Sequence, residues 1–512
     1  MTIEGAPPGR EESAPAACAG TFATARPAKR LWARALTLGA ANAFDYLAQF
    51  VLPIALVRCL DTAAFAQYRL LWLAAGTVLA IATLSMPASL YYFLLRSDRD
   101  TRRLYINQTL LFLLLAGLVA GWAVSSWNPW LPDSLHELAR FPVLVPAFVL
   151  LSVVASLLDL LPTVEERISA QVRLTLGLAA LRTVVMTAAA LSTRELGPVL
   201  AAMVVFVAVK VALLLGYVAR HHGLRRPILR WPAFVNQVQH AAPIGAAGAL
   251  YGLRLQADQW VAAALLPLSA FASFSVGAVL APLLNLFRQS FNAAFLPSMS
   301  RMHAAGDLDR MVELNGRANV MVAALVYPLL AFAFVYAEEI VTVIYTASYV
   351  QAAPVMRVYI VGLLAVVIEL ATLTLLLRQG PFVLRLSVVA LPLSVAISWY
   401  SAARFGIAGA AAGSSIAMYV DRLATLWRIA RCTGIPLRRL QDWRSLALLL
   451  LLAAIAAALA WRVSGAWFVA SPPIIRATVG GATLAVAYGA LYRLQFGGAR
   501  APKPVNHPQS VP

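Results

Sequence analysis

The feature that most constrains this 512-residue chain is a series of long apolar segments, many of them close to 20 residues in length. A helix of about 20 residues crosses the hydrocarbon core of a bilayer. Hydrophobic residues make up 61% of the sequence and charged residues only 12%. Because helices satisfy their own backbone hydrogen bonds in lipid, segments of this length predict an all-α polytopic membrane protein.

About fourteen transmembrane helices are expected. The segments lie at 33–57, 67–95, 104–125, 141–163, 174–192, 198–219, 241–266, 269–300, 318–337, 352–377, 381–403, 407–430, 445–467 and 472–494. The flanking residues 1–32 and 495–512 are rich in Ala, Pro and polar residues, which predicts disordered tails. The first tail has no apolar region following a basic one, so a signal peptide is not expected.

The cations alternate between the two sides of the predicted membrane. Of the 41 Lys and Arg residues, 28 fall on the side of the termini and six on the opposite side. Cytoplasmic loops carry the excess of Lys and Arg, so both termini are predicted to be cytoplasmic. A net charge of +19 would indicate nucleic-acid binding in a soluble chain. Here the cations flank apolar segments, and nucleic acid is not an expected partner.

A short internal similarity suggests that the chain is duplicated. Residues 266–274 (LPLSAFASF) share four identities in nine positions with residues 60–68 (LDTAAFAQY), at an offset of 206. We therefore expect two six-helix lobes related as repeats, followed by two additional helices. The predicted division is a tail at 1–32, a lobe at 33–219, a basic linker at 220–240, a second lobe at 241–430, two helices at 431–494 and a tail at 495–512.

Charged side chains occur inside the segments that open the second half. Arg254 and Asp258 lie within one predicted helix and Arg288 within the next. An Arg or Asp at the centre of a membrane helix costs about 2.5 to 3.5 kcal/mol unless it faces a bundle interior or a water-filled cavity. Arg254 and Asp258 are four residues apart and could neutralise each other. Alternatively, Arg254 and Arg288 bind an anionic group in a cavity, with Asp258 holding Arg254 between transport cycles.

Other buried charges are candidates for the same cavity or for ion coupling. Arg58 and Arg69, near the outer ends of the first two segments, are further substrate-binding candidates, while Asp45, Glu369 and Asp421 are ion-coupling candidates. A carboxylate in a low-dielectric site has a raised pKa and can carry a proton or cation. The alternative for each carboxylate is a structural hydrogen bond, and Arg182 and Lys210 could be its partners.

Several classes of function are excluded by what the sequence does not contain. The six histidines fall in loops, tails or segment ends, which gives no metal-ligand spacing within the membrane. Neither a phosphate-binding P-loop motif nor a dinucleotide-binding glycine motif is present. No loop is large enough for a catalytic domain, and the three cysteines form no Cys-x-x-Cys motif. Neither an enzyme nor a cofactor is therefore expected.

Several motifs in the first half resemble a known family. An apolar helix ends in Arg-x-Leu at 58–60, Phe-x-x-Tyr follows at 65–68, and the next helix leads to a turn of small residues and proline at 86–88. This order resembles the polysaccharide flippases of the multidrug/oligosaccharidyl-lipid/polysaccharide (MOP) exporter superfamily. The family usually has Gly after that Phe, where this chain has Ala66. The second half repeats the pattern, with Asp258 at the acidic position of the seventh helix; residues 295–311, 336–365 and 404–429 are also similar.

The resemblance covers residues 35–435 and implies a function. It implies two lobes around a cavity that opens alternately to each side of a bacterial inner membrane. The implied substrate is a lipid-linked oligosaccharide, with membrane lipids, a polysaccharide polymerase and glycosyltransferases as further partners. The competing interpretations are a drug or small-cation antiporter of the same superfamily, a lipid II flippase, and a non-transporting scaffold of a polysaccharide assembly complex.

Overall fold

The computed structural model describes residues 26–223, 227–468 and 470–496, with side chains at 26–36, 95, 282–283 and 285–294 outside the description. These ranges are mainly helical and contain no strand. The first helices are α1 (Arg26–Cys59), α2 (Thr62–Ala82), α3 (Met86–Phe93), α4 (Arg99–Ala123), α5 (Leu144–Ala155), α6 (Leu161–Val164), α7 (Ile168–Thr193), α8 (Leu196–His221) and α9 (Trp231–Leu265). Residues 26–32 and 495–496, which were expected in the tails, are therefore helical, and the rest of both expected tails lies outside the described ranges.

The second half of the chain contains the other helices. They are α10 (Leu268–Gly277), α11 (Leu280–Ala304), α12 (Leu308–Val335), α13 (Ala337–Ile344), α14 (Ala352–Val366), α15 (Ala371–Leu376), α16 (Gly380–Ala410), α17 (Ala412–Thr433), α18 (Leu437–Leu440), α19 (Trp443–Trp467) and α20 (Pro473–Phe496). Short 3-10 helices lie at Leu94–Arg96 (η1), Asp133–Arg140 (η2) and Ala347–Tyr349 (η3).

Nine membrane spans are recognisable among the described residues by length and apolar composition, or ten if η2 and α5, bent by 101°, form one span. The other predicted segments coincide with α9 and α17, which carry charged side chains, or with the interrupted pairs α10/α11 and α14/α15. Each of the fourteen predicted segments therefore corresponds to a helix or an interrupted helix. The break between α2 and α3 has a local cause, because Leu84 and Ser85 adopt positive φ and Pro87 follows.

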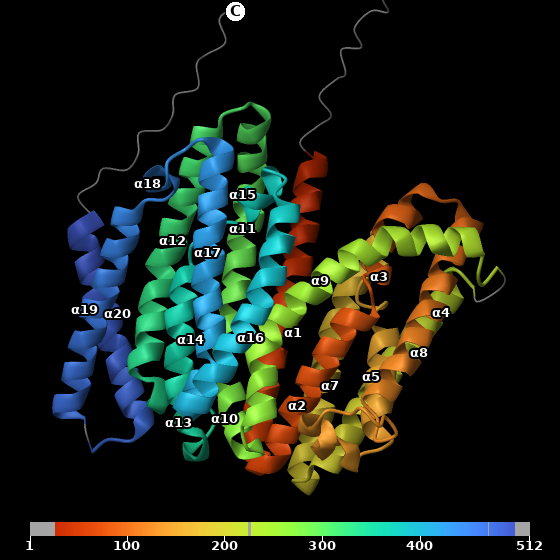
Figure 1. Cartoon of the computed structure of the whole chain (residues 1–512), viewed down its shortest axis with the longest axis horizontal. Helices are drawn as coiled ribbons and strands as arrows, with labels where there is room; N and C mark the ends of the chain where they lie inside the picture. Colours follow the sequence, from red (N-terminus) through yellow and green to blue (C-terminus); the bar gives the residue numbers. More distant parts are fainter. Residues whose placement is uncertain (1–25, 224–226, 469, 497–512) are drawn as a thin grey trace, which may run out of the picture.

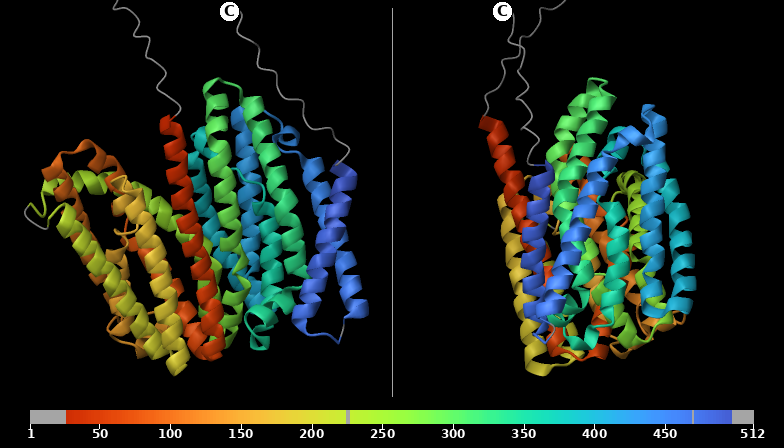
Figure 2. Two further views of the ribbon diagram at one scale, coloured as in Figure 1. Left: turned by 180° about the vertical axis from the view of Figure 1, so that it is seen from behind. Right: turned by 90° about the vertical axis from the view of Figure 1, so that its left-hand side faces the viewer.

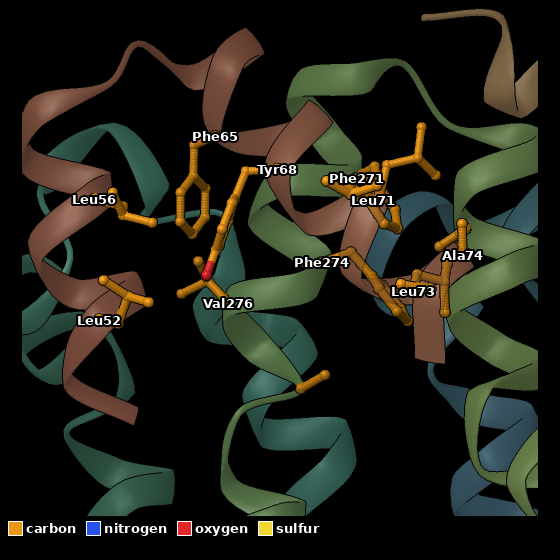
Figure 3. Close-up of a cluster of buried hydrophobic side chains, with 14 of the residues drawn as sticks. Leu52, Leu56, Phe65, Tyr68, Leu71, Leu73, Ala74, Phe271, Phe274 and Val276 are labelled. Atoms are coloured by element: carbon orange, nitrogen blue, oxygen red, sulfur yellow. The ribbon is translucent and has the colours of Figure 1, made fainter. Parts of the chain in front are cut away.

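The duplication has a structural counterpart in the positions of the helix ends. Helix α2 begins at Thr62 and α10 at Leu268, and α1 ends at Cys59 and α9 at Leu265, so both boundaries repeat at the offset of 206. The repeated aromatic residues Phe65 and Phe271 are buried in one core, in which α2 packs beside α10 (Figure 3). The two repeats are therefore packed against each other.

The helices form two groups that converge at one end of the molecule. Helices α2 to α8 form one group and α10 to α20 the other, and the groups diverge toward the end where α1 begins and α20 ends (Figure 1). The view from behind shows the same divergence, with α1 between the groups (Figure 2). Helix α1 begins and α20 ends on the same side, as the fourteen predicted segments require.

Helix α9 connects the two groups. Its first part crosses α3 and α4, and its last part packs against α16 (Figure 1). The Gln237 amide nitrogen donates to the hydroxyls of Ser89 at 2.8 Å and Thr109 at 2.9 Å, which anchors the first part in the N-terminal group. Residues 231–240, expected in a basic linker, are thus the beginning of a helix.

Candidate functional site

A central cavity of about 400 Å³ lies between α1, α2, α9, α14, α16 and α17. Its charged lining residues are Arg69, Arg254, Asp258, Asp421 and Arg422. Four of these belong to the set expected from the sequence, and three of the five are cations. The tertiary structure thus brings together candidates from both halves of the chain in one partly apolar cavity, the usual character of a ligand site.

The partner of Arg254 is Asp421. The Arg254 Nη1 atom lies 2.7 Å from Asp421 Oδ1, and the two side chains are only 14% and 17% exposed. The Arg254 guanidinium also lies over the Tyr251 ring, 5.6 Å from its centre. Of the two alternatives open for Arg254, neutralisation by Asp258 is not what the structure shows, because helix packing brings Asp421 of α17 to the guanidinium instead.

Asp258 is buried separately, with 1% of its surface exposed. One carboxylate oxygen accepts a short hydrogen bond from the Tyr359 hydroxyl, and the other accepts from the Gln259 backbone amide at 2.8 Å. Tyr359 and the nearby cavity residue Ser414 were missed by the sequence analysis. Both stand in apolar or small-residue runs where a single hydroxyl gives no recognisable pattern.

The outer candidates Arg58 of α1 and Arg69 of α2 both contact the C-terminal group at the end where the two groups converge. The Arg58 guanidinium donates to the backbone carbonyls of Val343 at 2.5 Å and Ile344 at 3.4 Å. Arg69 lines the central cavity and donates to the Ser275 carbonyl at 3.3 Å. Arg58 therefore lies outside the cavity that it was expected to line, and its contacts close this end of the molecule.

A second cavity, of about 340 Å³, lies among α1, α2, α5, α7 and α8. Two ion pairs line it: Arg182 with Asp45 at 2.8 Å, and Lys210 with Asp159 at 2.7 Å. Gln49 donates to Asp45 at 2.7 Å and lines both cavities. Asp45, an expected ion-coupling residue, therefore lies in a different cavity from the central charges, and its partner Gln49 lines both cavities.

The structure does not place Glu369 in either cavity. It precedes α15, where its carboxylate accepts from the Ala371 backbone amide at 2.7 Å, and its backbone bonds to Asn315 and Asn319 of α12. These contacts stabilise the break between α14 and α15. Arg288 lies within α11, but its side chain is outside the described part of the structure.

Comparisons with known proteins agree with this architecture. Residues 55–354, more than half of the chain, match the sequence model of a family described as "Polysaccharide biosynthesis protein". The lipid II flippase MurJ in an inward closed conformation superposes with a TM-score of 0.66 at 12% identity, covering 88% of this chain and 99% of that chain. No curated protein sequence matches the chain significantly.

Two transporters of another kind share the fold. An inward-facing multidrug resistance MATE family transporter of the MOP superfamily gives a TM-score of 0.59 at 12% identity, covering 76% of this chain and 96% of that chain. A mutant of the Vibrio cholerae MATE transporter VcmN gives a TM-score of 0.51 at 13% identity, covering 81% of this chain and 98% of that chain. At these identities the likeness establishes the fold alone.

Proposed function

The chain belongs to the polysaccharide biosynthesis protein family, and we propose that it is a flippase for a polyprenyl-diphosphate-linked oligosaccharide. The substrate is the repeat unit of an O-antigen, a capsule or an exopolysaccharide, moved from the inner to the outer leaflet of a bacterial inner membrane. Both termini are then cytoplasmic, and a polymerase and glycosyltransferases act on the same glycan. The family and the fold indicate a transporter rather than an enzyme.

The observation that carries the proposal is the cationic character of the central cavity. Arg69 and Arg254 face a space between the two helix groups, and an anionic diphosphate needs such donors in a low-dielectric site. Arginine binds phosphate oxygens through two parallel hydrogen bonds. In the structure the Arg254 guanidinium is paired with the Asp421 carboxylate. A bound diphosphate would replace this carboxylate as the partner of Arg254.

Transport follows from alternating access to this cavity. Arg58 and Arg69 hold the two groups together at one end, and the groups diverge at the end that carries the termini. Rocking of the two groups about the central cavity would break these contacts and expose the substrate to the outer leaflet. The lipid tail can remain in the bilayer while the diphosphate and the glycan cross.

The membrane potential is sufficient to drive net export. Moving one charge across the membrane is worth about 2.3 kcal/mol per 100 mV, so two negative charges leaving a negative interior gain roughly 5 kcal/mol. Ion coupling through Asp45, Asp421 or Glu369 is a second possibility for the driving force. Asp45 and Asp421 each have an arginine partner, so coupling would require those pairs to open during the cycle.

The alternatives differ in the chemistry that they need. A drug or small-cation antiporter of MATE type needs carboxylates that are available to the cation, whereas Asp421 is paired and Asp258 is hydrogen-bonded by Tyr359. A lipid II flippase would use the same diphosphate chemistry, and the glycan would distinguish it. A non-transporting scaffold would not require charged side chains around a central cavity.

Deletion of the gene tests the proposed function directly. We expect lipid-linked glycan to accumulate in the inner leaflet, with loss of surface polysaccharide and normal cell-wall synthesis. Reconstitution of the purified protein into liposomes containing the labelled glycolipid should restore access to the outer leaflet. Normal surface polysaccharide combined with increased drug sensitivity would instead identify a drug exporter, and arrested cell-wall synthesis would identify lipid II as the substrate.

A further inference from the structure

A third cavity, of about 640 Å³, lies at the end of the N-terminal helix group where α4 and α7 begin and α8 ends. We call it the basic pocket. Its cationic or titratable basic side chains are Arg99, Arg102, Arg103, Arg167, His221 and His222. It shares no residue with the central cavity or with the second cavity. Transport through the central cavity therefore does not explain why these side chains converge.

Its two acidic residues neutralise only part of this charge. Glu165 is engaged inside the pocket by His222, by the Tyr217 hydroxyl at 2.5 Å and by Arg167 at 3.5 Å. The other acid, Glu166, is exposed. Arg103 also pairs with Asp100, which lies just outside the pocket, at 3.6 Å. Four guanidinium groups thus face three carboxylates, one of which already has three partners. The pocket retains a net positive charge in the part of the chain that the structure describes.

Two of the arginines are held in place by hydrogen bonds from their Nε atoms to backbone carbonyls. The Nε atom of Arg102 donates to the Ser97 carbonyl at 2.9 Å, and the Nε atom of Arg103 donates to the His222 carbonyl at 2.5 Å. These contacts orient the guanidinium planes without using the Nη atoms of Arg102. A guanidinium oriented in this way is suited to the paired acceptor oxygens of a phosphate.

Aromatic residues place the pocket near a membrane surface. Tyr91 and Tyr92 of α3 are 45% and 44% exposed, and the Arg96 guanidinium lies 4.2 Å from the centre of the Tyr92 ring. Exposed tyrosines beside arginines are typical of the headgroup level of a bilayer. We propose that the basic pocket binds a phosphate group, supplied either by the headgroup of an anionic lipid or by a free phosphate.

The experiment compares paired arginine substitutions in the full-length protein. The Arg99→Gln/Arg102→Gln variant removes two charges from the pocket, and the matched Arg438→Gln/Arg439→Gln variant removes two exposed charges from α18. Binding of phosphatidylglycerol is titrated by native mass spectrometry in phosphatidylcholine nanodiscs. Melting temperatures verify that both variants are folded, and Arg99→Lys/Arg102→Lys serves as a charge-preserving variant.

We expect the pocket variant to bind phosphatidylglycerol about tenfold more weakly than the α18 variant, since two charge-assisted contacts are lost. The lysine variant should recover part of this affinity. If millimolar inorganic phosphate displaces the lipid, the pocket accepts a free phosphate; if only the lipid binds, the ligand is a headgroup. Equal binding of lipid and phosphate by the pocket and α18 variants would overturn the proposal.

Discussion

Arg254 of α9 and Asp421 of α17 form an ion pair of 2.7 Å across the central cavity, although 167 residues separate them in the sequence. The pair connects the helix that links the two groups with a helix of the C-terminal group. Because both side chains are largely buried, removal of either one would leave the other as an uncompensated buried charge and destabilise the fold. The same arginine is the leading candidate for diphosphate binding, so its structural and transport roles must be separated experimentally.

Substitution of both partners should separate these roles. Arg254→Ala leaves Asp421 buried without its cation, and we expect a loss of about 3 kcal/mol in the free energy of unfolding. Arg254→Ala/Asp421→Asn removes the lone charge and should recover most of that stability. Glycolipid flipping in liposomes should remain about tenfold or more below that of the wild type in both variants. A double variant that flips substrate at the wild-type rate would contradict phosphate binding by Arg254.

Gly245 lies where α9 crosses the α2–α3 break, and we expect any side chain at this position to destabilise the fold. A Cβ atom at Gly245 would overlap the backbone carbonyl group of Leu84, whereas a Cβ at Gly248 meets nothing within 4 Å. Gly245→Ala should therefore lower the free energy of unfolding by about 1 to 3 kcal/mol through overpacking. Gly248→Ala, in the same helix, should be neutral or slightly stabilising. Thermal unfolding in detergent measures both, and equal melting temperatures would refute the close contact.

The contacts of Arg58 should favour the state in which the outer ends are closed. Arg58→Ala removes its two donations to the α13 carbonyls, worth about 1 to 3 kcal/mol together. Spin labels at Trp127→Cys and Val350→Cys, in a background without the native cysteines, report the separation of the two groups. We expect a larger population at long distance in Arg58→Ala.

Arg140→Ala is the matched control for this measurement, because Arg140 is also outside the cavity and pairs locally with Glu137 at 3.4 Å. Its distance distribution should equal that of the labelled parent protein. An unchanged distribution in Arg58→Ala would show that the Arg58 contacts do not determine which end is closed.

The acidic centre of the basic pocket should make stability depend on pH. Burial opposes ionisation of Glu165, but hydrogen bonds from His222 and Tyr217 outweigh it and lower the pKa of this carboxyl below its ordinary value. A lowered folded-state pKa contributes stability above the unfolded pKa of about 4.3, and this contribution is lost as pH falls through the folded pKa. The melting temperature of Glu165→Gln should therefore lie below that of the wild type at pH 7.

This difference should shrink progressively as the pH falls through the lowered folded-state pKa, because the wild-type carboxyl then becomes protonated. Glu166→Gln, at the exposed neighbouring position, provides the control and should show a smaller difference at pH 7. A Glu165→Gln effect of constant size between pH 7 and pH 3 would mean that its charge does not contribute.

Much of the architecture could be predicted because it depends on local properties of the chain. The apolar segment length predicted helices, and each of the fourteen segments corresponds to one or to an interrupted pair. The predicted resemblance to the polysaccharide branch of the MOP superfamily is confirmed by the family match and the shared fold. The repeat between residues 60–68 and 266–274 anticipated the equivalent starts of α2 and α10.

Which charges meet was decided only by the tertiary structure. Spacing along one helix placed Asp258 within reach of Arg254, but the rotation of α9 buries Asp258 beneath Tyr359 and directs Arg254 to Asp421. Spacing describes neighbours on one helix, whereas a buried charge selects its partner among all the helices packed around it. The sequence by itself determined the helices, their duplication and the family. Helix packing determined the ion pairs, the cavities that they line and the contacts that close one end.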